Sequence, residues 1–363
     1  MSNFAMSKRS QALINLSGPV AAAVVNPLFT APLLWLLTKA PGQFQEPALR
    51  QLARLPASFT VPRIVSALKW LVVFGVVDKL NGWLSSLATN GWSVRSDADR
   101  WIWPREVAVV TGGCSGIGEV VVKGLVEKGV KVAILDVQPL PKRLEHNLIF
   151  YQRCDITDAD AVSHAADQIK STIGNPSILV NNAGIGASHT IIETTPEELN
   201  KIFGVNLLSH WYTCRAFLPN MIKHDKGHVV TVASMASFVT VASITDYAAT
   251  KSGALAFHEG LTQELRHRHN APNVHTTVVH PNWTKTPLVA DHADHLERNQ
   301  GQLLTADFVG GSILKQIFGC RGDQLILPRT FKNLAGIRGW PHWLQERVRD
   351  GVGKIGTGDE LKQ

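Results

Sequence analysis

A tyrosine and a lysine one helical turn apart, with a serine upstream, are the residues of this chain best suited to proton transfer. Tyr247 and Lys251 lie in the run Asp246-Tyr247-Ala248-Ala249-Thr250-Lys251, and Ser234 follows the strand-like run 228–233. Residues four apart share one face of a helix, so the Lys251 ammonium can lie beneath the Tyr247 ring. A nearby cation favours the phenolate over the phenol, whose ordinary pKa is about 10. Tyr247 is therefore a candidate acid or base near neutral pH.

A tyrosine and a lysine at this spacing also occur in ordinary packed helices, so the elements around them must decide. Residues Glu106–Gly118 predict a short β-branched strand that runs into the turn Thr111-Gly112-Gly113-Cys114-Ser115-Gly116-Ile117-Gly118, where a helix begins. Glycines let the backbone approach a pyrophosphate, which the N–H groups of a helix N-terminus stabilise. The pattern predicts a dinucleotide-binding turn.

A second predicted strand, Val130–Leu135, ends in Asp136, eighteen residues after Gly118. A carboxylate there can hydrogen-bond the adenosine ribose hydroxyls and repel a 2′-phosphate. The sequence therefore predicts NAD as the preferred cofactor and NADP as the lesser one. Lys142 and Arg143 are close enough in sequence to soften this preference.

Strand-like and helical segments alternate through the rest of the chain, and the helix start Thr195-Pro196-Glu197-Glu198 supplies an N-cap and acidic first-turn residues. This alternation predicts an α/β fold, a Rossmann-type doubly wound parallel sheet covered by helices on both faces. The predicted strands lie near 106–111, 131–136, 148–151, 177–181, 228–233, 274–280 and 323–328.

From about Arg105 to Pro328 the chain resembles the short-chain dehydrogenase/reductase family. The glycine turn fits the family's TGxxxGxG pattern, Asn181-Asn182-Ala183-Gly184 fits its NNAG signature, and Asp155 fits its adenine contact. Asn206, Ser234, Tyr247 and Lys251 complete its catalytic tetrad. The resemblance implies cofactor binding by Thr111, Gly112, Ser115, Gly116, Ile117, Gly118, Asp136, Asp155, Ile156, Asn182, Ala183, Gly184, Tyr247, Lys251, Pro281, Thr284 and Thr286.

The resemblance also implies a role for each member of the tetrad. The Ser234 hydroxyl holds the substrate oxygen and Tyr247 exchanges a proton with it. Lys251 binds the nicotinamide ribose and lowers the pKa of Tyr247, and Asn206 positions a water that links Lys251 to solvent. Relatives commonly dimerise through the helices that carry Asn206 and Tyr247, which leaves room for a homodimer.

One departure from the family pattern indicates which branch of the family the chain resembles. After the sixth strand the family usually has Pro-Gly, whereas this chain has His280-Pro281-Asn282-Trp283-Thr284-Lys285-Thr286. This segment resembles the 17β-hydroxysteroid dehydrogenase type 11 and retinol dehydrogenase branch, whose members act on lipophilic alcohols and ketones at the endoplasmic reticulum or on lipid droplets. The family builds its substrate lid where this chain has Leu288–Thr305.

The N-terminal region differs in composition from the predicted catalytic domain, and we divide the chain into an apolar region 1–95, a catalytic domain 96–330 and a C-terminal extension 331–363. Ser10–Thr38 contains no charged residue, and a second apolar stretch, Ile64–Trp92, is interrupted by three charges. Six of the ten tryptophans favour a membrane interface in this region: Trp35, Trp70, Trp83, Trp92, Trp101 and Trp103. The pattern predicts association with a membrane or lipid-droplet surface, with the catalytic domain in the cytosol. A cleaved secretory signal after Lys8-Arg9 and a helical subdomain packed on the enzyme are the alternatives.

Composition limits the other functions. The formal net charge is +7, but the positive residues are dispersed and no nucleic-acid motif is present. The four cysteines lack the spacing of a disulfide or zinc framework, and Asp291–His295 is a polar loop segment, so we expect no metal site. Beside an oxidoreductase for steroids, retinoids or fatty alcohols, two alternatives stay open: a soluble-substrate ketoreductase of secondary metabolism and a catalytically silent membrane-surface scaffold.

Overall fold

The structure is a computed structural model and describes residues 25–54, 56, 60–186 and 188–356. Its contacts divide the chain into two compact units, which meet in sequence between Ala88 and Thr89, and each is described by itself. Lys8, Arg9 and residues 10–24 of the charge-free stretch lie outside the described residues, as do residues 357–363 of the C-terminal extension.

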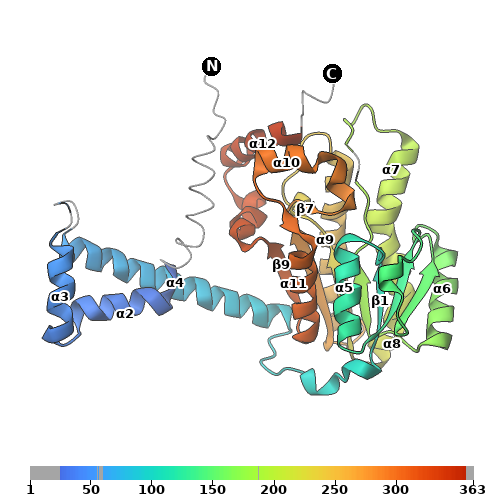
Figure 1. The fold of residues 1–363 in the computed structure, drawn as a ribbon, viewed down its shortest axis with the longest axis horizontal. Helices are drawn as coiled ribbons and strands as arrows, with labels where there is room; N and C mark the ends of the chain where they lie inside the picture. Colours follow the sequence, from blue (N-terminus) through green and yellow to red (C-terminus); the bar gives the residue numbers. More distant parts are fainter. Residues whose placement is uncertain (1–24, 55, 57–59, 187, 357–363) are drawn as a thin grey trace. The chain divides into compact units, whose positions relative to one another are not determined.

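The first unit consists, among the described residues, of helices α2 (Pro27–Thr38), α3 (Gly42–Leu52) and α4 (Val61–Thr89) (Figure 1). Asn26 caps α2 by accepting the Leu28 N–H at 3.1 Å. Gly75 lets α4 approach the start of α2 closely, since a Cβ there would lie 2.1 Å from the Val25 carbonyl oxygen. The second apolar stretch is thus helical as far as Thr89. Among the described residues, no helix has both the length and the hydropathy needed to cross a membrane.

The second unit is built on a seven-stranded parallel sheet in the order β3-β2-β1-β4-β5-β6-β9. The seven strands predicted from the sequence are all present, with ends that differ by one or two residues, and the predicted parallel pairing is confirmed. Their bounds are β1 Val107–Thr111, β2 Lys131–Asp136, β3 Ile149–Arg153, β4 Ile178–Asn181, β5 Gly227–Val232, β6 Val274–Pro281 and β9 Asp323–Leu327.

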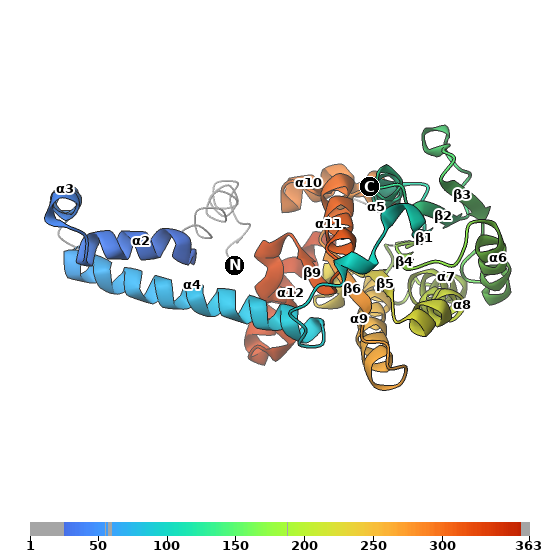
Figure 2. The same cartoon turned by 90° about the horizontal axis from the view of Figure 1, so that it is seen from below.

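Helices cover both faces of this sheet (Figures 1 and 2). Successive residues of a strand point to opposite faces, so Ala108 and Val110 of β1 pack under α5 and α11, whereas Val109 packs under α6, α8 and α9. The helices are α5 Gly116–Glu127, α6 Ala159–Thr172, α7 Pro196–Phe203, α8 Ser209–His224, α9 Thr245–His267, α10 Ala293–Gln300, α11 Ala306–Phe318 and α12 His342–Gly356. The predicted cap of α7 is confirmed as a capping box, in which Thr195 and Glu198 each accept the other's backbone N–H.

Shorter elements connect these pieces. Strands β7 (Thr284–Lys285) and β8 (Leu304–Thr305) form a two-stranded sheet that the sequence did not predict, because two residues are too few for a periodic pattern. The π-helical turn η4 (Gly204–Leu208) joins α7 to α8. The 3₁₀ helices are η1 Ala98–Arg100, η2 Trp103–Arg105, η3 Lys142–Leu144, η5 Met235–Ser237, η6 Pro287–His292 and η7 Arg329–Gly339.

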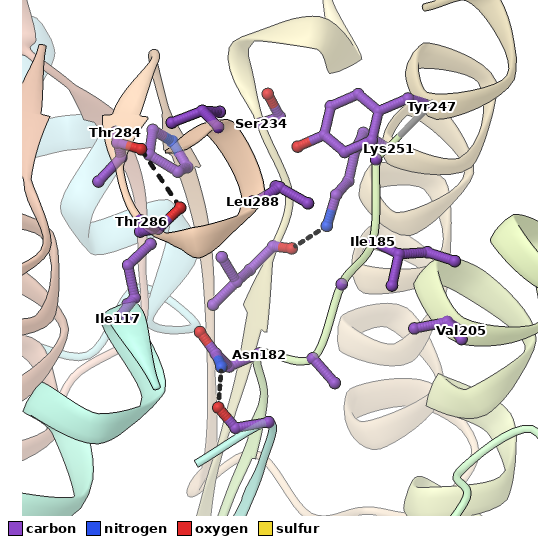
Figure 3. A pocket seen from close by; sticks show the side chains of 18 of the residues that line it. Ile117, Asn182, Ile185, Val205, Ser234, Tyr247, Lys251, Thr284, Thr286 and Leu288 are labelled. Carbon is purple, nitrogen blue, oxygen red and sulfur yellow. Dashed lines mark hydrogen bonds between the residues drawn. The ribbon is translucent and has the colours of Figure 1, made fainter. Parts of the chain in front are cut away.

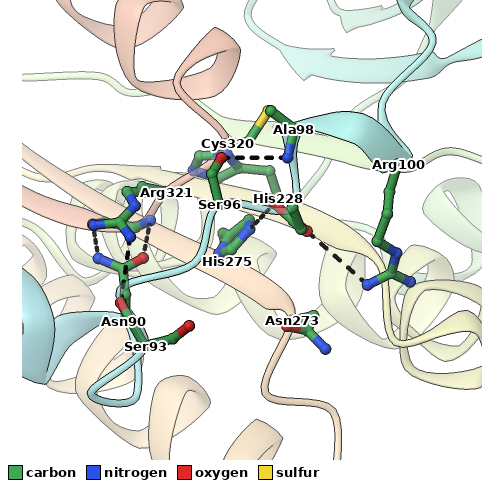
Figure 4. Close-up of polar contacts among 12 residues, drawn as sticks. Asn90, Ser93, Ser96, Ala98, Arg100, His228, Asn273, His275, Cys320 and Arg321 are labelled. Atoms are coloured by element: carbon green, nitrogen blue, oxygen red, sulfur yellow. Dashed lines mark hydrogen bonds and ion pairs between the residues drawn. The ribbon is translucent and has the colours of Figure 1, made fainter.

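Residues 90–100 form hydrogen bonds near the amino ends of β6 and β9, whereas the predicted site lies at the carboxyl ends of the strands (Figure 4). Asn90 donates to the Gly322 carbonyl at 3.0 Å and accepts the Gly322 N–H at 2.8 Å, and Asp97 contacts His275 at 2.9 Å. Arg321 donates to the carbonyl of Ser93. This segment therefore belongs structurally to the second unit.

Candidate active site

The glycine turn folds as its sequence requires. Gly112 and Gly116 have φ of 64° and 56°, a region that residues with a Cβ rarely adopt. A Cβ on Gly118 would lie 2.2 Å from the Gly112 carbonyl oxygen, and one on Gly116 would lie 3.3 Å from Thr286 Cγ2. The turn is thus a bare backbone cradle that leads into the N-terminus of α5. It fits the pyrophosphate of a dinucleotide, which needs close backbone approach.

Hydrogen bonds from the NNAG segment at the end of β4 hold the glycine turn in position. Asn182 donates through Nδ2 to the carbonyls of Thr111 and Gly112 at 3.0 and 3.1 Å. In return the Thr111 hydroxyl accepts the N–H groups of Asn182 and Ala183, both at 3.0 Å. Thr111 and Gly118 do not line the cavity themselves but hold the residues that do.

Two carboxylates mark the end of the cavity where the sequence predicts the adenosine. Asp136, at the end of β2, accepts the N–H groups of Cys114 at 3.0 Å and Gln138 at 2.9 Å. Asp155 accepts from the backbone and hydroxyl of Thr157 at 2.9 and 2.8 Å. An ionised carboxylate has about four acceptor positions, so each retains capacity for a further donor.

Arg143 does not face Asp136 as a free cation. It forms two 2.7 Å hydrogen bonds with the Glu119 carboxylate on α5. These bonds, together with Lys123, lower the pKa of Glu119 to about 2. The Arg143 guanidinium is therefore already engaged by a carboxylate.

Ser234, Tyr247 and Lys251 converge on one wall of the cavity (Figure 3). The Ser234 hydroxyl oxygen accepts the Ala236 N–H at 3.1 Å, which caps η5, and the hydroxyl also forms a hydrogen bond with Tyr247. Lys251 donates to the Val232 carbonyl at 2.8 Å, and its Nζ lies 5.6 Å from the centroid of the Tyr247 ring. The helical spacing thus puts the lysine beneath the tyrosine, as the sequence indicated.

The pKa of Tyr247 is raised, whereas the sequence predicted a lowered one. Burial raises the pKa of its phenol, and a hydrogen bond with Ser234 opposes this only in part. Burial also lowers the pKa of Lys251 to about 8. The expected lowering of the Tyr247 pKa is wrong because both groups are desolvated, and because Lys251 Nζ lies over the face of the ring, 5.6 Å from its centroid. Without a cofactor, Tyr247 is a phenol at neutral pH.

Asn206 occupies the π-helical turn between α7 and α8, a kind of bulge that is frequent at functional sites. Its amide pairs with the backbone of Ile185, accepting the N–H at 2.8 Å and donating to the carbonyl at 2.9 Å, and Nδ2 also contacts Thr250 Oγ1 at 3.2 Å. Gly184 lies between Asn206 and Lys251, since a Cβ on it would be in ordinary van der Waals contact, 3.5 Å from both Asn206 Oδ1 and Lys251 Nζ. Asn206 lies behind the cavity wall and fixes the Gly184–Ile185 loop against α9.

Sequence reasoning missed a buried histidine beside the tetrad. His280, at the end of β6, contacts the Ser234 carbonyl through Nδ1 at 3.0 Å and Gln324 Nε2 through Nε2 at 3.2 Å. If the Gln324 amide donates to Nε2, then Nδ1 carries the proton that is donated to Ser234. Burial lowers the pKa of His280 to about 4, so the ring is neutral. The position before Pro281 was the available signal, and it was used only to assign the branch.

One cavity of about 1080 Å³ joins these parts. Its lining contains most of the sequence-predicted cofactor residues: Gly112, Ser115, Gly116, Ile117, Asp136, Asp155, Ile156, Asn182, Ala183, Gly184, Tyr247, Lys251, Pro281, Thr284 and Thr286. The remaining wall was not predicted, apart from the lid segment. It includes Val239, Val241 and Ile244 after Ser234, Leu288, Val289, His295 and Leu296 in the lid, and Phe331, Leu334 and Val352 near the C-terminus, beside polar residues elsewhere such as Gln138, Asn200, Lys201 and Asn282.

The fold and this site define a dinucleotide-dependent oxidoreductase. Residues 106–297 match the family model of the short chain dehydrogenases. The chain is 41% identical over 210 residues to dehydrogenase RED2 of Cochliobolus heterostrophus, covering 58% of this chain and 78% of the relative. It is 31% identical to human estradiol 17-beta-dehydrogenase 11 over 53% of this chain and 66% of that one.

A solved structure, the 3-ketoacyl-(acyl-carrier-protein) reductase of Brucella melitensis complexed with NADH, is 25% identical, with a TM-score of 0.55 over 62% of this chain and 98% of that chain. The chain therefore belongs to the short-chain dehydrogenase/reductase family, whose members interconvert alcohols and ketones with NAD(P).

No group of three or more His, Cys, Asp or Glu side chains able to hold a metal ion gathers within the described part of the chain. The side chains of Asp291 and His292, in the polar segment considered above, lie outside that part.

Proposed function

We propose that this enzyme interconverts a hydroxyl and a carbonyl group on a lipophilic substrate, with Tyr247 as the general acid and base. The observation that carries the proposal is the composition of the cavity around Ser234 and Tyr247. Three segments of the lining, the one after Ser234, the lid and the C-terminal one, contribute only apolar residues except for His295. A largely apolar pocket with a few polar groups orients an apolar ligand by its one reacting group.

The chemistry follows from the hydrogen bonds of the free site. The Ser234 hydroxyl, whose oxygen accepts the Ala236 N–H, has one hydrogen that can be donated to a substrate oxygen in place of its hydrogen bond with Tyr247. Tyr247, a phenol at neutral pH, can give its proton to the same oxygen during reduction and take it back during oxidation. We infer that the Lys251 ammonium, 5.6 Å from the centroid of the Tyr247 ring, helps to stabilise the tyrosinate that is left when the proton has been given up. When bound, a nicotinamide supplies or accepts the hydride.

The test is a substrate panel. Protein purified in detergent would be assayed with NAD(H) and NADP(H) against steroid, retinoid and long-chain ketones or alcohols, and against small water-soluble ketones. We expect kcat/KM to be higher for the lipophilic compounds. Turnover confined to soluble ketones would replace this proposal by a soluble-substrate ketoreductase, and NADH binding without any turnover would replace it by a silent scaffold.

We also propose that NAD(H) is preferred over NADP(H). Asp136 supports this because its charge, at the end of β2, opposes a 2′-phosphate. The engagement of Arg143 by Glu119 supports it further, because a phosphate would have to compete with two 2.7 Å hydrogen bonds.

For the first unit we propose association with the membrane of the endoplasmic reticulum or a lipid droplet, with the catalytic domain in the cytosol. Its described helices expose large apolar side chains, among them Leu28 at 78%, Trp70 at 61% and Phe74 at 60%. Exposed apolar groups in such number favour an apolar surface.

Cell fractionation of the full chain and of a protein that begins at Thr89 tests the association. A start at Thr89 retains the hydrogen bonds of Asn90 to Gly322, which a start at Ser96 would remove. We expect the full chain in the membrane fraction and the shortened one in the supernatant. Full-length protein in the low-salt supernatant without detergent would refute the proposal.

We propose a homodimer through α8 and α9. Trp211 on α8 is 50% exposed and packs edge-on against Phe257 of α9, with ring centroids 4.6 Å apart. Light scattering on the Thr89 protein should give twice the chain mass, and Trp211→Arg should give a monomer. A wild-type monomer at micromolar concentration would contradict it.

A further inference from the structure

The chain beyond β9 packs against the catalytic residues rather than leaving the domain. Helices η7 and α12 share an apolar cluster with Met235, Phe238 and Val239, the residues that follow Ser234. Ile337 of η7, fully buried, belongs to this cluster. Arg338 donates to the Ser237 carbonyl at 3.2 Å and to the Ser252 hydroxyl at 3.4 Å, next in sequence to Lys251.

Three side chains of this segment reach the cavity. Phe331 and Leu334 of η7 and Val352 of α12 line it, and α12 also contacts the lid helix α10. Val348 packs in the same cluster one helical turn from Val352 but does not line the cavity. Helix α12 therefore presents Val352 to the cavity, whereas Val348 packs in the apolar cluster.

We propose that residues 329–356 form the end wall of the substrate compartment, and that Phe331, Leu334 and Val352 set the size of the apolar body that the enzyme accepts. The proposal rests on the hydroxyl–carbonyl activity proposed above. The substrate class is an uncharged ketone or alcohol whose hydrocarbon part fills the space between the lid and this wall. Burial of one methylene favours binding about fourfold, so kcat/KM should rise with hydrocarbon length until the wall is reached.

The test measures kcat/KM for a series of straight-chain 2-ketones, from butanone to tetradecan-2-one, with NADH. For Val352→Phe, which narrows the compartment, we expect a loss that grows with chain length and reaches at least tenfold for the longest ketones. For Phe331→Ala and Val352→Ala, which widen it, the optimum should shift to longer ketones. The NADH dissociation constant should change less than twofold in all three.

Val348→Ala is the matched control. It removes the same atoms from the same cluster as Val352→Ala, so it reports the effect of loosened packing alone. We expect the wild-type length optimum in Val348→Ala. The proposal is overturned if Val348→Ala and Val352→Ala shift the profile equally, or if Val352→Phe lowers kcat/KM by the same factor for every ketone.

A second readout separates this proposal from the proposed activity. Prodan, a neutral fluorescent naphthyl ketone, would be titrated into the protein–NADH complex. If no ketone is turned over, the activity proposal fails, but weaker Prodan binding to Val352→Phe than to Val348→Ala would still support the end wall. Equal binding to both variants would overturn it.

Discussion

The two halves of the cavity are built in different ways. The cofactor half consists of backbone and short polar side chains at the carboxyl ends of β1, β2 and β4, fixed by hydrogen bonds such as those between Asn182 and Thr111. The half that we assign to the substrate is lined mainly by apolar side chains from three segments, of which the outermost are more than a hundred residues apart. Tyr247 and Ser234 line the same cavity as both groups of residues (Figure 3). On the function proposed above, the turns bind the dinucleotide and the packing of apolar side chains selects the substrate.

The largest expected effect is a loss of kcat that leaves binding in both halves of the cavity unchanged. Tyr247→Phe keeps the ring and removes the proton, so kcat should fall by about 10²–10⁴-fold, the range for general acid–base groups. The dissociation constants of NADH and Prodan should stay within about twofold. Tyr212→Phe, on α8 and outside the cavity lining, is the control and should retain wild-type turnover. A folded Tyr247→Phe enzyme with near-normal kcat would exclude the mechanism.

The second prediction concerns the buried charge at that junction. A pKa of about 8 for Lys251, against about 10.4 in the unfolded chain, corresponds to about 3 kcal/mol of destabilisation below pH 8. Lys251→Met removes this cost but leaves the Val232 carbonyl without its donor, which costs about 1–3 kcal/mol. We expect inactive protein that is more stable at pH 7 by about 1 kcal/mol.

The pH dependence tests the cause of that gain. The folded pKa of Lys251 is lowered, so between pH 8 and 10.4 the unfolded state binds more protons and wild-type stability rises with pH. The advantage of Lys251→Met, measured by urea unfolding, should therefore shrink across this window. An advantage that is constant from pH 7 to 10 would show that the lysine is not desolvated.

Asp136→Ala probes the cofactor half alone. Loss of the carboxylate should lower the ratio of kcat/KM for NADH over NADPH by at least about tenfold, because both a ribose hydrogen bond and a repulsive charge disappear. Glu119→Gln, which weakens the hold on Arg143, should lower the ratio in the same direction by less. A wild-type preference for NADPH that Asp136→Ala leaves unchanged would contradict this assignment of the pocket.

The smallest effect is expected at Gln324, which contacts His280, the histidine hydrogen-bonded to the Ser234 carbonyl. Gln324→Leu removes the contact with His280 Nε2, and a neutral hydrogen bond contributes about 1 kcal/mol, so kcat should fall by no more than about fivefold. His280→Phe also removes the donor to Ser234 and should cost more. If Gln324→Leu costs more than His280→Phe, the two residues do not act in series.

The difference between the halves explains what the sequence could predict. β-branched runs, glycines that need positive φ, and a Tyr and Lys four apart are local signals, and from them the seven parallel strands and the cofactor turn followed. Phe331, Leu334 and Val352 carry no such signal, because an apolar residue that lines a cavity has the same local pattern as one in a core. The raised pKa of Tyr247 depends on burial, and the π-helical turn at Asn206 depends on packing between α7 and α9. Neither burial nor packing can be predicted from the spacing of residues in the sequence.

Hydride transfer itself tests the central claim most directly. Wild-type protein would be incubated with NADH carrying deuterium on both C4 positions and with dodecan-2-one, and the alcohol product would be analysed by mass spectrometry. The account predicts one deuterium on the carbinol carbon for each NADH oxidised, and loss of this product in Tyr247→Phe but not in Tyr212→Phe. Bound NADH that is never oxidised by any ketone of the panel, or a product alcohol without deuterium, would contradict it.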